Sequence, residues 1–377
     1  MEKRKFEKLG IETSLLGFGC MRFPATPDGK IDEPRAEKLL DRAIAAGVNY
    51  IDTAYPYHNG DSEPFVGKVL QKYDRNSFYL ATKLPVWAIE SVDDAKRVFA
   101  EQLERLRTDH IDFYLLHALN KERFEKIKNL HLIDHMLEAR KAGKIRYLGF
   151  SFHDDLEVFK QIVDYTDQWD FCQIQYNYID TQVQAGDKGY ELAAKMGVPM
   201  VIMEPVKGGR LANLPEEAKE ALNEADPDRS AASWALRWVG SHENVKVILS
   251  GMSSMEQLED NLETFGKFQP LTEAEEEAVE KAADLIRSRV KNGCTSCRYC
   301  MPCPFGVNIP EMFSIWNNCA MFDEEEKAKK AYAEQKVQDA SADLCKKCGA
   351  CEKACPQGLS IRADLEKVAK ELNTEEA

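Results

Sequence analysis

The stretch Ala45-Ala46-Gly47-Val48-Asn49-Tyr50-Ile51-Asp52-Thr53 contains the end of one predicted element and the whole of the next. Glycine adopts the left-handed conformation that closes many helices, so Gly47 predicts the end of a helix that begins near Glu33. The residues from Asn49 to Thr53 form a short run of the kind found in strands. The stretch therefore predicts a helix followed by a strand, and the carboxylate of Asp52 stands at the end of that strand.

The same alternation of short strands and helical segments continues from Leu15 to Phe265. Eight strand-like runs are predicted, at residues 15–21, 49–53, 77–83, 111–117, 145–151, 171–175, 199–203 and 245–249. Helical spacing of apolar residues lies between them, for example at residues 33–46, 93–107, 130–142, 154–165 and 228–239. Eight βα units over roughly 250 residues are typical of the closed (β/α)8 TIM barrel, an α/β fold, whereas an open doubly wound sheet usually has fewer strands. The segment from Gly17 to Arg22 lacks the third glycine of a dinucleotide fingerprint, which also disfavours the open sheet.

The charge balance excludes some partners. The chain has 64 acidic and 50 basic residues and a net charge of −14, so a nucleic acid or an anionic membrane surface would repel it. The charged amino terminus is followed by no apolar signal segment, and no run approaches the ~18 apolar residues of a membrane span. We expect a cytoplasmic protein that binds neither nucleic acid nor membrane.

Four chemically active side chains follow predicted strands. Asp52 and Tyr57 follow the second strand, Lys83 ends the third, and His117 ends the fourth. In a (β/α)8 barrel these strand ends build the active site. A cation near a phenol favours the phenolate and lowers its pKa, which would tune Tyr57 as a proton donor. The alternatives are that Asp52 is a turn residue, Lys83 a rim charge and His117 a core histidine.

The spacing Asp52-x4-Tyr57, with Ala-Thr-Lys83 and Leu-Leu-His117 at the next strand ends, resembles the aldo-keto reductase family. The resemblance covers about residues 6–265. It implies a (β/α)8 barrel and carbonyl reduction, or alcohol oxidation, by NADPH or NADH with no metal in the reaction. It also implies that Tyr57 is the general acid, that Lys83 and Asp52 form the ion pair that adjusts it, and that His117 orients the carbonyl.

The resemblance also implies nicotinamide contacts. Ser151 and Gln173 match the residues that bind the nicotinamide amide, but Phe152 replaces the asparagine that usually follows the serine. Met203 stands where the family often has a tyrosine that stacks on the ring.

The segment that begins at Gly251 resembles the adenosine side of the family's nucleotide site and includes Ser253, Gln257 and Asn261, the last suited to the adenine. NADP-preferring relatives have an arginine at the position of Gln257. Without that cation a 2′-phosphate gains less binding energy, so the choice between NADP and NAD stays open. Lys207, Arg210 or another residue is the alternative source of charge.

Nine of the eleven cysteines lie between Cys294 and Cys355. In an intracellular chain such clustering favours metal binding over disulfides. A four-cysteine zinc site usually pairs two Cys-x2-Cys motifs, whereas this chain has three cysteines at x2 spacing twice. The second run, Cys345-x2-Cys348-x2-Cys351-x3-Cys355-Pro, matches the bacterial ferredoxin pattern for [4Fe-4S] clusters. The first run, Cys294-x2-Cys297-x2-Cys300-x2-Cys303-Pro, has x2 where that pattern has x3.

In two-cluster ferredoxins the fourth cysteine ligates the other cluster. We therefore predict one cluster on Cys294, Cys297, Cys300 and Cys355, and a second on Cys345, Cys348, Cys351 and Cys303. Cys20, Cys172 and Cys319 are left as buried thiols. The expected domains are the barrel at residues 1–270, a linking helix at 271–292 and a small, mainly α-helical ferredoxin-like domain at 293–377.

Hydride transfer moves two electrons and a cubane cluster passes one, and no flavin site is evident in the sequence. Three functions stay open. The first is an aldo-keto reductase acting on a small carbonyl or alcohol, with clusters that are structural or serve an external redox partner protein. The second is an electron-transfer protein whose barrel serves a flavoprotein partner or an unusual substrate. The third is a sensor whose barrel has lost catalysis; the intact set of four side chains favours the first over this one.

Overall fold

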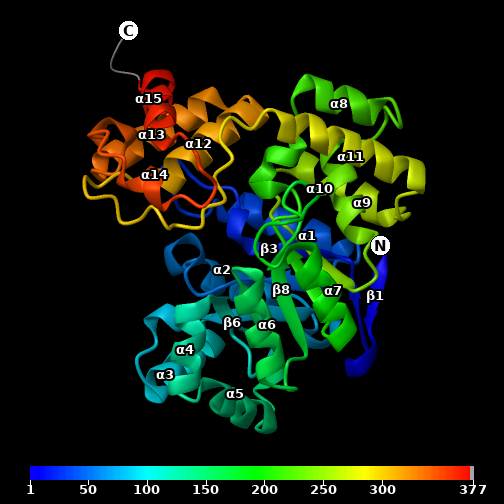
Figure 1. Cartoon of the computed structure of the whole chain (residues 1–377). Coiled ribbons are helices and arrows are strands. Elements are labelled where there is room, and N and C mark those ends of the chain that lie inside the picture. Colours follow the sequence, from blue (N-terminus) through cyan, green and yellow to red (C-terminus); the bar gives the residue numbers. More distant parts are fainter. Residues whose placement is uncertain (374–377) are drawn as a thin grey trace. The chain divides into compact units, whose positions relative to one another are not determined.

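The computed structural model describes residues 1–373. Figure 1 shows the chain coloured along its sequence. It divides into two compact units, which are residues 1–212 with 229–276, and residues 213–228 with 277 onward. The predicted boundaries at residues 270 and 292 remain a proposal about the domains.

A closed barrel of parallel strands forms the first unit and confirms the predicted fold. Its order is β10-β3-β4-β5-β6-β7-β8-β9, with β10 paired to β3. The strands are β3 (Leu16–Gly19), β4 (Tyr50–Asp52), β5 (Tyr79–Leu84), β6 (Ile111–Leu119), β7 (Ile145–Phe152), β8 (Phe171–Gln175), β9 (Met200–Met203) and β10 (Val245–Ser250). Each overlaps one of the eight predicted runs, because a buried parallel strand is apolar along its whole length and ends where polar residues begin.

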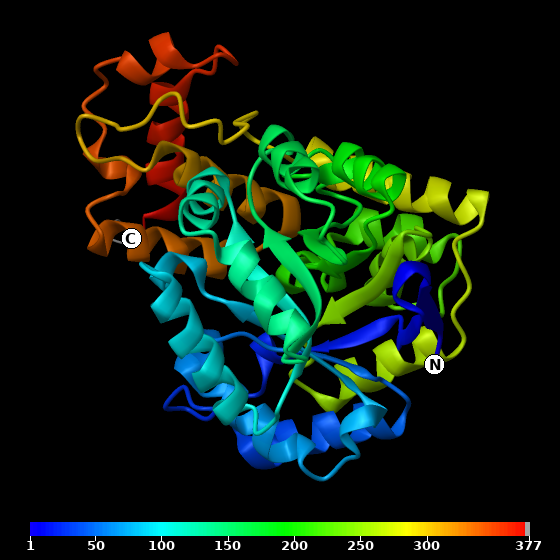
Figure 2. The ribbon, with the colours of Figure 1, turned by 90° about the horizontal axis from the view of Figure 1, so that it is seen from below.

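Helices cover the outside of the barrel (Figure 1), and the view along the perpendicular direction shows the strands enclosed by them (Figure 2). They are α1 (Glu33–Ala45), α2 (Ser62–Leu70), α3 (Val92–Arg105), α4 (Lys121–Asn129), α5 (Leu132–Lys141), α6 (Leu156–Tyr165), α7 (Gly186–Met196), α9 (Ala231–Gly240) and α10 (Met255–Gly266). Helix α1 begins and ends within a residue of its predicted bounds. Asp32 caps its amino terminus by accepting from Arg35 N. Ala46 caps its carboxyl terminus and is followed by Gly47, which has a φ of 92°.

An antiparallel hairpin that the sequence analysis did not identify precedes the barrel. It consists of β1 (Lys3–Phe6) and β2 (Ile11–Ser14). Phe6 is buried, and its ring centroid lies 5.5 Å from that of Phe113, inside the barrel. Phe113 also packs against Tyr50 and Phe171, at centroid distances of 4.9 and 5.0 Å. Aromatic side chains therefore fill the barrel interior beneath the strand ends that bear the predicted site.

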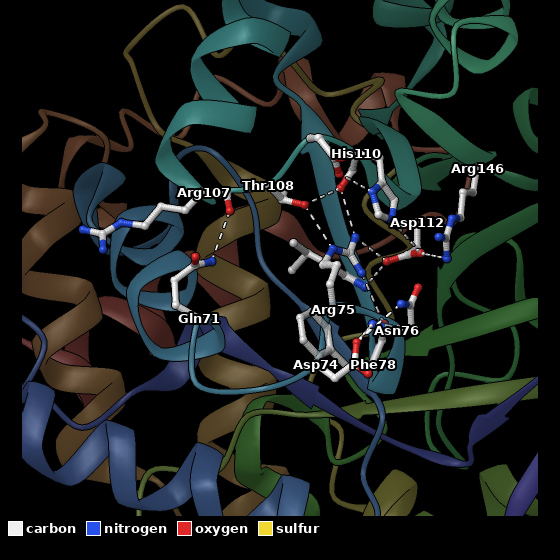
Figure 3. Close-up of polar contacts among 12 residues, drawn as sticks. Gln71, Asp74, Arg75, Asn76, Phe78, Arg107, Thr108, His110, Asp112 and Arg146 are labelled. Atoms are coloured by element: carbon white, nitrogen blue, oxygen red, sulfur yellow. Dashed lines mark hydrogen bonds and ion pairs between the residues drawn. The ribbon is translucent and has the colours of Figure 1, made fainter.

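A buried carboxylate ties three neighbouring strands together at their amino ends (Figure 3). Asp112, on β6, accepts from Leu80 N on β5 at 2.9 Å. It also pairs with Arg75 Nη2 at 2.7 Å and with Arg146 Nη1, on β7, at 2.8 Å. Because these strand ends lie opposite the active-site end of a barrel, we assign this cluster to stability.

The second unit is helical. Its elements are α8 (Glu216–Asn223), α11 (Glu273–Ser288, which begins within the first unit), α12 (Ile309–Phe322), α13 (Glu325–Val337), α14 (Ala350–Ala354) and α15 (Ile361–Leu372). Helices α12 and α13 follow each other almost directly. Only Asp323, with φ 52°, and Glu324 separate the two helices.

The core of the second unit lies between α12, α13 and α15. Phe313, Trp316, Leu365 and Val368 are buried there, and Trp316 Nε1 donates to Glu371 Oε2 at 2.7 Å. This core holds the two cysteine segments, which have little regular structure of their own. Within residues 1–373 no helix has both the length and the apolar composition needed to cross a membrane.

Candidate active site and iron–sulfur sites

A buried ion pair lies at the carboxyl ends of β4 and β5. Lys83 Nζ donates to Asp52 Oδ1 and to the carbonyl oxygen of Thr53, both at 2.7 Å. The side chains of Lys83 and Asp52 are 0 % and 3 % exposed. Asp52 Oδ2 has no hydrogen-bond partner among the described residues. A charge is rarely buried in this way without a partner, and each of these two charges compensates the other.

Tyr57 and His117 stand beside this pair, so the structure brings together all four side chains that the strand ends predicted. Tyr57 begins a short turn, η3 (Tyr57–Gly60), directly after β4. Lys83 Nζ lies 5.1 Å from the centre of the Tyr57 ring. The rings of Tyr57 and His117 are 6.2 Å apart and nearly perpendicular.

The acidity of Tyr57 differs from the sequence-based expectation. Burial raises the pKa of Tyr57, the positive charge of Lys83 lowers it, and the net pKa lies above its ordinary value of 10.0. Lys83 acts in the expected direction, but the loss of solvent around the phenol outweighs it. Tyr57 therefore keeps its proton at neutral pH, as a proton donor must.

The two neighbours of Tyr57 differ in charge, since Lys83 is positive and His117 is neutral. Burial opposes the charge of Lys83, but Asp52 and Tyr57 together raise the pKa of Lys83 above its ordinary value. Burial, reinforced by Lys83 and His153, lowers the pKa of His117 well below 6.5. His117 is therefore a neutral imidazole next to an ammonium group, and its Nδ1 is buried without a partner among the described residues. A neutral imidazole can donate one hydrogen bond to a carbonyl oxygen.

A second buried polar cluster supports Lys83 from behind. Gln102, on α3, donates to the backbone oxygen of Lys83 at 3.1 Å and to Glu63 Oε1 at 2.7 Å. Thr82, the neighbour of Lys83 on β5, also donates to Glu63 Oε1, at 2.6 Å. The sequence analysis missed this cluster. The sequence feature that could have revealed it is a polar residue, Gln102, on the apolar face of α3 that also contains Val98 and Phe99.

The three predicted nicotinamide residues lie on the adjacent strands β7, β8 and β9. Ser151 is buried on β7 and its Oγ accepts from Ala118 N at 2.7 Å. Gln173, on β8, donates to Met203 Sδ, on β9, at 3.6 Å. The Gln173 Oε1 atom is buried without a partner among residues 1–373. A free buried acceptor of this kind fits the NH2 group of a nicotinamide carboxamide.

Phe152 is fully buried and packs against Phe159 of α6, at a centroid distance of 5.2 Å. The side chain at this position therefore contributes to the core.

The other predicted nucleotide residues lie at the junction of β10 and α10. Ser253 Oγ donates to the carbonyl oxygen of Arg22 at 2.6 Å, and Gln257 Oε1 accepts from Ser253 N at 2.8 Å. Asn261 is buried and donates to Ser250 Oγ at 2.9 Å. At Gly251 a Cβ atom would lie 2.7 Å from Arg22 Cγ, so the close approach of this loop to Arg22 requires a glycine. The hydrogen bonds of these residues stay within the segment from Ser250 to Asn261, apart from the bond to Arg22, which follows β3.

Lys207, one of the alternative sources of positive charge, has a carboxylate partner. Its Nζ contacts both oxygens of Asp180 at 2.6 Å. Asp180 also accepts from Gln175 and Asn177, at 2.9 and 3.1 Å. This pair connects the loops that follow β8 and β9.

The eight predicted cluster cysteines line two adjacent pockets of the second unit. One pocket is lined by Cys294, Cys297, Cys300 and Cys355, and the other by Cys300, Cys303, Cys345, Cys348 and Cys351. The fourth cysteine of each run thus faces the first three of the other run. This is the arrangement of crossed ligands in two-cluster ferredoxins.

The donor set fits cubane clusters. Within residues 1–373 no three His, Cys, Asp or Glu side chains converge closely enough to hold one metal ion. A cubane does not require such convergence, because each of its four irons takes a different thiolate. Of the remaining cysteines, Cys20 and Cys172 are buried as predicted, whereas Cys319 is only partly buried.

The fold and the site define a (β/α)8-barrel protein with a buried ion pair at the carboxyl ends of its strands, joined to an iron–sulfur domain. The chain belongs to the aldo/keto reductase family, whose sequence model matches residues 15–284. The model of the 4Fe-4S dicluster domain matches residues 293–359. The chain is therefore an oxidoreductase of the aldo-keto reductase family with a 4Fe-4S domain at its carboxyl end.

Several known proteins are similar to the barrel. The uncharacterized oxidoreductase YqkF of Bacillus subtilis is 28 % identical over 74 % of this chain and 96 % of its own length. L-galactose dehydrogenase of Arabidopsis thaliana is 26 % identical over 78 % of this chain and 96 % of its own length. The structure of aldo-keto reductase AKR11C1 from Bacillus halodurans, in its holo form, is 29 % identical, covers 75 % of this chain and 96 % of its own, and has a TM-score of 0.62.

Proposed function

We propose that this protein reduces the carbonyl group of a small substrate with NADH or NADPH, with Tyr57 as the general acid, and that it carries two [4Fe-4S] clusters. The observation that carries the proposal is the buried Lys83–Asp52 pair beside a phenol whose pKa is raised. The bound nicotinamide would supply a hydride to the carbonyl carbon. The residues of the chain would supply the proton and the geometry.

Each of the four residues has a distinct task in this proposal. Tyr57 gives its phenolic proton to the carbonyl oxygen as the hydride arrives, and the resulting phenolate is stabilised by the ammonium of Lys83. Asp52 keeps Lys83 charged and fixes its position. His117, which is neutral, donates an N–H to the same carbonyl oxygen and orients it. Alcohol oxidation would use the same groups in reverse.

Gln173 and Ser151 would hold the carboxamide of the nicotinamide, Met203 would lie against its ring, and Asn261 with the loop from Gly251 would hold the adenosine end. Gln257 is neutral, Lys207 is paired with Asp180, and Arg210 has an interaction of its own, so none of the three offers a free cation for a 2′-phosphate. We therefore propose that the protein uses NADH and NADPH with efficiencies within about tenfold of each other, a difference of about 1.4 kcal/mol.

The test is an anaerobic assay of the full chain, loaded with iron and sulfide, with benzaldehyde and each nicotinamide in turn. Oxidation of the nicotinamide in step with formation of benzyl alcohol is expected. Failure to turn over benzaldehyde or any aldehyde of a broad panel, with both clusters present, would contradict the proposal.

A second candidate function is electron transfer through the clusters to an external redox protein. Cys297 and Cys348 are exposed, so two of the cluster ligands lie at the surface. Arg298, Lys346 and Lys353 are also exposed and have no carboxylate partner among residues 1–373. Such a basic rim on an acidic chain favours an acidic partner.

Stopped-flow reduction of the clusters by an acidic flavodoxin tests this second candidate. The double substitution Arg298→Glu and Lys346→Glu should slow the reduction at low salt, whereas Lys330→Glu, on α13 of the same unit, should not. Equal rates for both variants would remove the candidate.

A further inference from the structure

Arg123 stands close to the candidate active site and has no role in the chemistry described so far. It lies in the first turn of α4, which follows β6, the strand that bears His117. Its guanidinium carbon lies 5.1 Å from the centre of the Trp87 ring, and that ring is 5.0 Å from the ring of His117. Arg123, Trp87, His117 and Tyr57 therefore form a continuous row that ends at the proton donor.

The position of the guanidinium is fixed by contacts that leave most of it free. Nη1 donates to the carbonyl oxygen of Ala118 at 2.6 Å, and the side chain is partly buried against Trp87. An arginine has five N–H donors in a rigid fork. In the described part of the chain no other acceptor bonds to the Arg123 side chain. The remaining donors can therefore bind a ligand without losing a protein contact.

The absence of a counter-charge distinguishes Arg123 from its neighbours. Lys126, one turn later on the same helix, pairs with Glu90 at 2.8 Å, and Lys207 across the barrel pairs with Asp180 at 2.6 Å. No ion pair of Arg123 occurs within residues 1–373, although acidic residues outnumber basic ones by 64 to 50. A partly buried guanidinium is costly without an anion, so its free energy falls when an anion binds.

The charge of Arg123 also reaches the place where a carbonyl would lie. Together with burial, Lys83 and His153, it lowers the pKa of His117. Lys83 is compensated by Asp52, whereas the guanidinium of Arg123 has no counter-charge among residues 1–373 and gives this part of the site a positive potential. An anionic group at the far end of a substrate would balance that potential while the carbonyl is held at Tyr57.

We propose that Arg123 binds a carboxylate of the substrate, so that the substrates are aldehyde or keto acids whose carbonyl lies at Tyr57 and His117 and whose middle packs against Trp87. The inference rests on the proposed carbonyl reduction. A carboxylate matches Arg123 in charge, since one free guanidinium balances one negative charge, whereas a phosphate carries about −1.5 to −2. The planar fork also matches a carboxylate in shape.

The test compares 4-carboxybenzaldehyde with methyl 4-formylbenzoate, a neutral ester of similar shape, on the full cluster-loaded chain. The acid should have a kcat/KM about 10- to 100-fold higher than the ester, mainly through KM, as expected for a charge-assisted contact of roughly 1.5–3 kcal/mol. Arg123→Gln keeps a donor for Ala118 O but removes the charge. It should bring the ratio of the two kcat/KM values close to one, mainly by raising KM for the acid. Arg123→Lys should keep part of the preference.

The control is Lys121→Met, which removes an exposed charge two residues away and should leave the ratio unchanged. 4-Formylphenyl phosphate gives a further arm: if it is preferred over the acid, and Arg123→Gln abolishes that preference, the assignment of a carboxylate is overturned.

A binding measurement separates failure of this inference from failure of the proposed function. By calorimetry, 4-(hydroxymethyl)benzoate should bind at least tenfold more tightly than 4-methylbenzyl alcohol, and Arg123→Gln should remove the difference. If the aldehydes are reduced but acid and ester react equally, the inference is wrong and the function stands. If no aldehyde is reduced, the function is wrong, and equal binding of the two alcohols would then overturn the inference as well.

Discussion

Lys83 Nζ lies 2.7 Å from Asp52 Oδ1 in a pair from which solvent is almost wholly excluded. The two residues are 31 positions apart in the sequence, and the parallel pairing of β4 with β5 brings them to the same end of the barrel. The pair places a fixed positive charge beside Tyr57, at a position that solvent does not reach.

Removal of one member of this pair should cost more stability than removal of both charges. Lys83→Met leaves the Asp52 carboxylate buried and uncompensated, a change that costs about 3–5 kcal/mol. The double variant Asp52→Asn, Lys83→Met has no buried charge and should recover most of that loss. Thermal unfolding followed by circular dichroism at neutral pH measures the difference, and a double variant as unstable as the single one would contradict it.

Replacement of Tyr57 by phenylalanine should lower kcat by about 10²- to 10⁴-fold, the usual contribution of a general acid, while the iron content stays unchanged. Tyr55→Phe is the matched control, because the Tyr55 hydroxyl donates to Glu101 at 3.2 Å, outside the row of active-site residues. We expect it to stay within a few-fold of the parent in assays of aldehyde reduction. Full activity in the Tyr57 variant would show that another group donates the proton.

The rate of aldehyde reduction should fall only at high pH, where Tyr57 loses its proton. The pKa of Tyr57 is raised above 10.0 and that of His117 is lowered well below 6.5. Both groups are therefore in their active, neutral forms across the range between those values. The kcat measured from about pH 6 should stay level and fall only as pH rises through the raised pKa of Tyr57. A loss of rate centred near pH 6.5 would mean that His117 titrates there.

If the fourth cysteine of each run ligates the other cluster, variants in different runs should damage the same cluster. Cys303→Ala and Cys345→Ala should damage the same cluster, whereas Cys355→Ala and Cys294→Ala should damage the other. The iron content should fall from about eight to about four atoms per chain in each variant, if the damaged cluster is lost. Paramagnetic resonance of the reduced protein should show the same surviving cluster for the two members of a pair.

Cys319→Ala is the control for these variants, since it should keep all the iron. If Cys303→Ala instead gave the spectrum of Cys294→Ala, the ligands would be uncrossed.

Asp112→Ala should destabilise the barrel without a direct effect on catalysis, because the substitution removes the carboxylate that joins β5, β6 and β7. We expect a loss of about 3 kcal/mol, at the lower end of the range for a broken buried pair, since Arg146 is 40 % exposed and solvent screens part of the interaction. The midpoint temperature of thermal unfolding should fall by roughly 5–10 °C.

The exposed pair of Asp41 with Lys72 provides the comparison for Asp112. Asp41→Ala should cost less than about 1 kcal/mol. A similar shift in unfolding temperature for both variants would contradict a special role for Asp112.

The sequence predicted the barrel and the positions of all eight of its strands, because buried parallel strands and amphipathic helices leave local patterns that need no knowledge of distant residues. Runs such as residues 171–175 have the bounds that the structure gives to β8. The hairpin from Lys3 to Ser14 was not predicted, since it is short and charged on its exposed side. Phe6 enters the barrel, and Leu9 and Ile11 pack against the same cluster, so the hairpin depends on contacts with distant strands.

Within the site, residue types and order predicted that Asp52, Tyr57, Lys83 and His117 would meet, because the carboxyl ends of consecutive strands lie at one end of a parallel barrel. Their catalytic roles stay a proposal. The spacing of the cysteines likewise predicted two sets of thiols, since a cubane requires closely spaced ligands from a short loop.

The tertiary structure alone decided how those groups behave. Burial raised the pKa of Tyr57 although the neighbouring Lys83 lowers it, and the degree of burial depends on every element packed around the phenol. The support of Lys83 by Gln102 and the row from Arg123 through Trp87 to His117 likewise join separate βα units. Local patterns determine which elements form, whereas burial and contacts between distant segments arise only when the chain closes around a common core.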